Sequence, residues 1–106
     1  MLIKKYQDLA LETAVYGEGK VLTYPILGML GEAGEVANKY KKVLRGDYKI
    51  EEVREALLDE CGDVLWYLNA TIRDLGGDLE SVCSNNIKKL QRRRKNGTIL
   101  GSGDNR

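Results

Sequence analysis

The chain has 106 residues, and its 17 lysines and arginines against 16 aspartates and glutamates give a formal net charge of +1. A chain of this length is expected to form one domain with a modest core, which favours an oligomer that covers further apolar surface. The near-neutral charge creates no overall field that would attract nucleic acid or an acidic membrane. Histidine is absent, which excludes histidine-based nucleophile activation and zinc sites that need imidazole.

No apolar run approaches the ~18 residues that a membrane-spanning helix needs. The N-terminal sequence MLIKKYQDLA also lacks the apolar stretch of a signal peptide. We therefore expect a cytoplasmic protein without a membrane partner.

Apolar residues recur at helical spacing in four segments. The first predicted helix covers about residues 2–16 and ends where Gly17 and Gly19 favour a loop. The second runs from about residue 24 to residue 45, with Pro25 acceptable in its first turn. Its apolar stripe comprises Ile26, Leu30, Ala33, Ala37, Tyr40 and Leu44.

The third predicted helix spans about residues 51–75, and Asp78 is the expected N-cap of a fourth that reaches about residue 95. The core face of the third comprises Val53, Leu57, Val64, Leu68, Thr71 and Leu75. No segment alternates with the period of a strand, so the predicted fold is all-α. We expect a single four-helix bundle-like domain over residues 1–96, completed by oligomerisation, and a flexible tail over 97–106.

The second helix carries Glu32 and Glu35, which lie three residues apart on the same side of the helix. Three glycines surround them, and each costs a helix interior roughly 1 kcal/mol relative to alanine. Close approach of another helix or of a ligand beside the carboxylates would offset that cost. Tight helix packing with solvated glutamates is the alternative. The glycines are Gly28, Gly31 and Gly34.

On the third helix, Glu60 and Asp63 form a second pair, and Glu60 falls within the apolar stripe between Leu57 and Val64. A carboxylate that faces a core is costly unless it is paired, hydrogen-bonded or bound to a metal ion. One alternative is a buried salt bridge. The other is a cation site formed by four carboxylates on two neighbouring helices, and without histidine this donor set favours Mg²⁺, or Mn²⁺ as a substitute.

The fourth helix is strongly basic between residues 88 and 95, and Asn86, Lys89 and Arg93 share one of its faces. Arginine and lysine side chains bind phosphate oxygens. A nucleic-acid-binding patch is a second interpretation. The simplest one is a solvated basic end that complements the helix dipole.

In combination, these features resemble the MazG-like family of all-α nucleoside triphosphate pyrophosphohydrolases. The match covers roughly residues 6–97, although Arg94 and Lys95 stand where family members often have an aromatic residue and a proline. Three stretches carry the resemblance: LGMLGEAGEV at 27–36, DECGDVLWY at 59–67 and NIKKL at 86–90.

The resemblance implies hydrolysis of a nucleoside or deoxynucleoside triphosphate, canonical or not, to the monophosphate and pyrophosphate. Glu35 is then the candidate that orients or deprotonates the attacking water. The ligands of Mg²⁺ or Mn²⁺ would be Glu32, Glu35, Glu60 and Asp63. Substrate would be bound by Asn86, Lys89 and Arg93, with further candidates in Lys39, Lys42, Tyr6, Gln7 and Tyr24. The family also implies a homodimer or homotetramer with sites near subunit interfaces.

Two other functions stay open. A non-catalytic helical module could bind nucleic acid through residues 88–95, although the near-neutral charge does not favour that partner. A regulatory oligomer could bind nucleotides without cleaving them.

Overall fold

The structure, a computed structural model that describes residues 1–106, contains four α-helices and no strand, which confirms the predicted all-α fold. None of the helices combines the length and the apolar character needed to cross a membrane. In chain order the elements are α1 (Ile3–Leu11), the short 3-10 helix η1 (Glu18–Lys20), α2 (Thr23–Leu44), α3 (Ile50–Asp74) and α4 (Leu79–Lys95).

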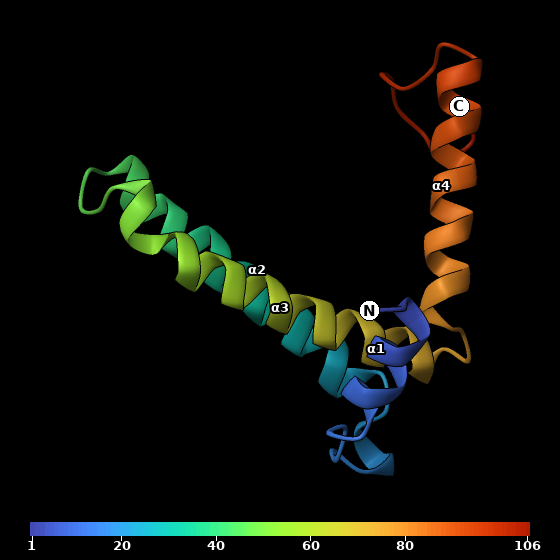
Figure 1. The fold of residues 1–106 in the computed structure, drawn as a ribbon, viewed down its shortest axis with the longest axis horizontal. Helices are drawn as coiled ribbons and strands as arrows, with labels where there is room; N and C mark the ends of the chain where they lie inside the picture. The colour runs from blue at the N-terminus through green and yellow to red at the C-terminus, as the bar shows by residue number, and fades with distance from the viewer.

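Helices α2 and α3 form a long antiparallel hairpin, and α1 packs at the end of the hairpin where α3 finishes (Figure 1). Helix α3 begins with a capping contact in which the Lys49 amide donates to Glu52 Oε1 at 3.1 Å. Asp78 caps α4 as predicted, because its carboxylate accepts from the Ser81 amide at 2.9 Å. These local contacts explain why both helices begin close to their predicted positions.

Helix α4 points away from the hairpin instead of lying along it (Figure 1). Residues 97–106, predicted as a flexible tail, fold back beside α4 (Figure 1). There the Arg106 guanidinium donates to the backbone carbonyls of Thr98, Ile99 and Gly103 at 2.7–3.0 Å.

Helix α1 ends at Leu11, so the prediction that it would extend to residue 16 is wrong. The Trp66 indole N–H donates to the Ala10 carbonyl at 3.1 Å and to Thr13 Oγ1 at 2.8 Å. The Thr13 hydroxyl itself donates to the Ala10 carbonyl at 2.7 Å. In a longer helix the Ala10 carbonyl would accept from a backbone amide of the next turn, so these side-chain bonds compete with the continuation of α1.

A buried carboxylate ties the loop before α2 to the end of α3. Asp74 accepts from the Tyr16 hydroxyl at 2.7 Å, from the Leu22 amide at 2.9 Å and from Arg73 Nε at 3.2 Å. Leu22 is the only non-glycine residue with a positive φ, at +66°, where side chains are strained. Burial raises the pKa of Asp74, but the bonds from Leu22, Tyr16 and Arg73 outweigh it and hold that pKa below its usual value.

The seam of the hairpin contains one close approach at a glycine. A Cβ on Gly28 would overlap the ring of Tyr67, whereas one on Gly31 or Gly34 would meet nothing within 4 Å. The expected close approach of a neighbouring helix is therefore found at Gly28 alone.

A single chain leaves much of its apolar surface uncovered. Only seven of the 106 residues are buried, and the predicted core residues Leu30, Leu44 and Leu75 are 64%, 73% and 68% exposed. The radius of gyration is 16.7 Å, against about 13 Å for a compact domain of this length. Within one chain, the bundle is therefore open.

We predict that Asp74→Asn lowers the free energy of unfolding by about 1–3 kcal/mol, because the charge that Arg73 and the Leu22 amide face is lost. The pKa of Asp74 in the folded protein lies below its unfolded value. Its contribution is therefore complete above the unfolded pKa and disappears as the pH falls through the folded one. Urea unfolding of both proteins from neutral to acidic pH, at one chain concentration, should show converging stabilities. A gap that persists at acidic pH would contradict this origin.

We predict that Gly28→Ala destabilises the protein by about 1–3 kcal/mol, since the ring of Tyr67 must move from its place. Gly31→Ala, the same change at an open position of α2, is the matched control. It should be neutral or stabilise by up to about 1 kcal/mol through helix propensity. Thermal unfolding of the two variants makes the comparison, and equal midpoints would show that the Tyr67 contact does not matter.

Candidate metal centre

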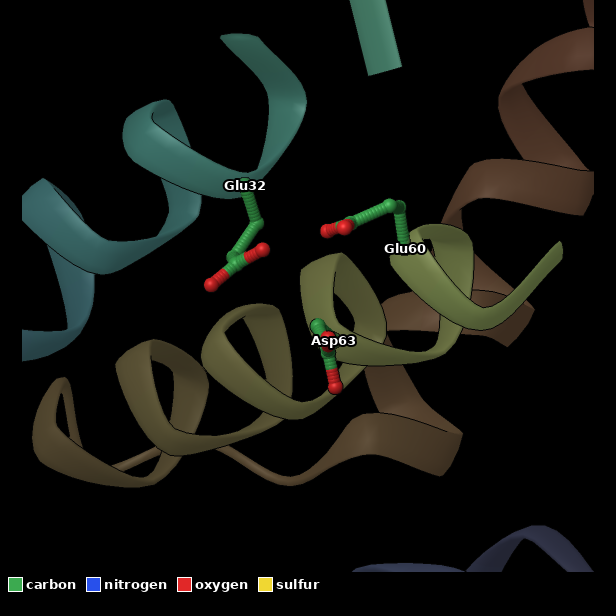
Figure 2. Close-up of side chains that lie close together, drawn as sticks. All are labelled: Glu32, Glu60 and Asp63. Carbon is green, nitrogen blue, oxygen red and sulfur yellow. The ribbon is translucent and has the colours of Figure 1, made fainter. Parts of the chain in front are cut away.

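Three of the four predicted metal ligands gather between α2 and α3. One carboxylate oxygen from each of Glu32, Glu60 and Asp63 lies within 4.8 Å of the others. Glu32 and Glu60 point toward one another from opposite helices, with Asp63 nearby on α3 (Figure 2). The three-residue spacing places Glu60 and Asp63 on one side of α3, so both face this region.

Glu60 is largely shielded from solvent, with 18% of its side chain accessible. Its Oε1 accepts from Lys39 Nζ at 3.1 Å, while Oε2 is buried without a hydrogen-bond partner. The buried salt bridge considered from the sequence therefore exists, but it satisfies only half of the carboxylate. An unpaired buried carboxylate oxygen is costly, and a cation bound to it would remove that cost.

The carboxyl groups of Glu32 and Glu60 influence one another directly. A protonated Glu32 can donate a hydrogen bond to Glu60, and this bond, burial and the nearby acidic charges raise the pKa of Glu32. The same bond from a protonated Glu32, and then the bond from Lys39, lowers the pKa of Glu60. Of these two acids, Glu60 therefore loses its proton more readily than Glu32.

Glu35, the fourth predicted ligand, lies outside this cluster. Its side chain is half-exposed, and its Oε2 lies 3.5 Å from Lys39 Nζ, one turn further along α2. Lys39 and Lys42 line a cavity of about 250 Å³ between α2 and α3, together with Glu35 and Tyr48. These two lysines therefore lie on the side of the cluster nearer the hairpin turn.

An aromatic cavity of about 350 Å³ opens beside the acids, lined by Tyr24, Glu32, Asp63, Trp66 and Tyr67. Tyr24 lies 6.0 Å from Tyr67, measured between ring centroids. Trp66 and Tyr67 were not among the candidate site residues, yet they follow Asp63 at helical spacing of three and four residues. That spacing was the signal that could have identified them.

The two candidates on α1 have different surroundings. Burial and the charge of Asp63 raise the pKa of Tyr6, whose phenol therefore lies within reach of the acidic charge. Gln7 serves the fold instead, because its Oε1 accepts from the Leu79 amide at 2.7 Å and its carbonyl accepts from Asn69 Nδ2 at 3.4 Å. Gln7 joins α1 to the start of α4.

The three predicted phosphate-binding residues lie on α4, which points away from the hairpin (Figure 1). Asn86 and Lys89 line a separate cavity of about 340 Å³. Arg93 is buried, with Nη2 donating to the backbone carbonyl of Asp104 at 3.0 Å and Nε left without a partner. Within one chain, these residues do not line the cavity that the carboxylates line.

The chain is similar to known proteins over most of its length. Residues 23–98 match the MazG nucleotide pyrophosphohydrolase domain, a range that includes both acid pairs and the whole of α4. The chain is also similar to the Gene 37 protein of Mycobacterium phage L5, with 43% identity over 114 aligned positions that span all of both proteins. No solved structure matches. The family match covers more than half of the chain, which therefore belongs to the MazG nucleotide pyrophosphohydrolase family.

Proposed function

We propose that this protein hydrolyses nucleoside triphosphates between the α- and β-phosphates, releasing a nucleoside monophosphate and pyrophosphate, with Mg²⁺ as cofactor and Mn²⁺ as a substitute. One observation carries the proposal: the oxygens of Glu32, Glu60 and Asp63 lie within 4.8 Å of one another, next to an aromatic cavity. Membership of the family supports the nucleotide as the class of substrate.

The donor set fits a hard divalent cation, because it consists of carboxylate oxygens and includes the buried, unpartnered Glu60 Oε2. Glu32, Glu60 and Asp63 would hold the ion. When bound, Mg²⁺ supplies positive charge that stabilises phosphoryl oxygens as the anhydride breaks.

Glu35 is the residue we propose as general base. Its half-exposed carboxylate is accessible to water and lies on the same helix as Glu32, about one turn away. It would accept the proton of the attacking water while the water oxygen bonds to phosphorus. The bridging oxygen of the anhydride then leaves with its electron pair, which separates monophosphate from pyrophosphate.

The nucleobase would occupy the aromatic cavity. Tyr24, Trp66 and Tyr67 offer ring faces and edges beside the acids. Stacking of a base on an aromatic side chain contributes about 1–3 kcal/mol and tolerates different bases. This cavity therefore supports nucleotide binding without selecting a particular base.

We further propose that the protein is a homodimer, or a tetramer of such dimers, in which α4 of one copy supplies Lys89 to the carboxylates of another. The open shape of the chain supports this assembly, as does the large exposure of Leu27 and Leu30 on α2 and of Leu58 on α3. A second copy that covered these side chains would bury apolar surface that one chain leaves in water.

Purified protein with Mg²⁺ is expected to convert at least one member of a panel of triphosphates to monophosphate and pyrophosphate, separated by ion exchange. Glu60→Gln should lower kcat/KM by more than about 100-fold, since a cation ligand is lost. Glu55→Gln, the same change at an exposed site on α3, is the control and should retain activity. Both variants should keep the helical circular dichroism.

Other results would favour other functions. If the folded wild type cleaves no canonical or modified nucleotide with either ion, the proposal is wrong. Metal-dependent nucleotide binding without product would indicate a regulatory protein. Salt-sensitive gel shifts that Lys89→Ala abolishes and Glu60→Gln does not would indicate nucleic-acid binding.

The shared site predicts complementation between two inactive variants. Glu60→Gln and Lys89→Ala chains, inactive separately, should recover activity when they are unfolded together and refolded as a mixture. A dimer with two shared sites should regain about one quarter of the wild-type sites, since half of the dimers are mixed and each has one intact site. A mixture as inactive as its parents would place Lys89 in its own chain's site.

Assembly itself is tested by sedimentation equilibrium. Leu30→Asp should weaken self-association, because it places a charge on the proposed interface. Leu100→Asp, at a more exposed position outside the hairpin, is the matched control and should leave the association unchanged.

A further inference from the structure

A lysine joins the two acidic helices at the edge of the carboxylate cluster. Lys39 Nζ lies 3.1 Å from Glu60 Oε1 and 3.5 Å from Glu35 Oε2. Its side chain is 29% exposed, so water screens these contacts less than it would on an open surface. The ammonium group therefore binds an oxygen of one clustered acid and the acid that lies outside the cluster.

The two oxygens of Glu60 have different surroundings. Lys39 occupies Oε1, whereas Oε2 is buried and has no partner. In sites with two metal ions, the ions lie about 3.5–4 Å apart and share the ligands between them. Here an ammonium already holds one oxygen of the acid that could bridge such a pair.

Lys39 also limits Glu35 as a ligand. It would be the natural ligand of a second ion, because it lies one turn from Glu32 on α2, but the same ammonium also binds it. A divalent cation bound to these oxygens would be repelled by Lys39 at close range in a partly dehydrated seam. The two cations compete for the same carboxylates.

We propose that Lys39 acts as an internal cation in place of a second divalent ion, so that each chain binds one ion at Glu32, Glu60 and Asp63. This inference rests on the proposed function for the kind of ion that binds. It makes Lys39 a positioning residue: it neutralises Glu60 from one side and keeps Glu35 out of the first ion's coordination.

Binding of Mn²⁺ without nucleotide tests the inference, with calorimetry for the number of ions and electron paramagnetic resonance for coupling between them. The wild type should bind one ion per chain and give an uncoupled spectrum. Lys39→Met, which removes the charge and keeps the side-chain length, should bind two and give a coupled one. Lys39→Arg should stay at one, and so should Lys42→Met, which removes a lysine without an ion pair.

Two ions per wild-type chain, or one per chain in folded Lys39→Met, would overturn the inference. If Lys39→Met does not fold, Glu35→Gln decides. It should keep the affinity for the single ion, whereas a loss on the order of tenfold or more would make Glu35 a ligand and overturn the assignment.

Hydrolysis is scored separately on the same preparations. A wild type that binds one ion and cleaves no nucleotide contradicts the proposed function and leaves the assignment of Lys39 intact. A wild type that binds two ions and cleaves nucleotides contradicts the assignment of Lys39 and leaves the proposed function intact.

Discussion

The pairing of α2 with α3 and the candidate metal centre both depend on one carboxylate, which the two helices enclose. Glu60 lies in the seam of α2 and α3, where an uncompensated charge would oppose the packing of the helices. Lys39, from the opposite helix, compensates one of its oxygens, and the other oxygen has no partner within the chain. The way in which the charge of Glu60 is compensated therefore determines both the pairing of the helices and the affinity of the site for a cation. A substitution that altered this compensation would change the stability of the protein and its affinity for a cation together.

The sequence predicted the long helices because their signals are local. Periodic apolar residues, the glycines in the loops and the Asp78 cap act within a few neighbouring positions, and α2, α3 and α4 follow them closely. The end of α1 depends instead on Trp66, and the loop that follows is held by Asp74; both residues come from more than fifty positions further along the chain. Such long-range bonds have no trace in the periodicity of residues 2–16.

Periodicity also shows which side chains share a face without showing what covers that face. Leu30 and Leu44 follow the apolar stripe of α2 as predicted, yet both are largely exposed in a single chain. The direction in which α4 leaves the hairpin likewise could not be predicted from local patterns in the sequence. The same reasoning applies to the site: spacing indicated that Glu60 faces inward, but not that Lys39 would bind it and hold Glu35 apart.

The position of Trp66 has a practical consequence. It is the only tryptophan in the chain, and it borders both the cavity that contains Glu32 and Asp63 and the neighbouring one at Tyr16. The emission of an indole ring depends on the polarity and the quenching groups around it, and carboxyl groups are among those quenchers. The tryptophan fluorescence of the unlabelled protein therefore originates from one place, next to the acids, and gives an optical signal for a molecule that enters either cavity.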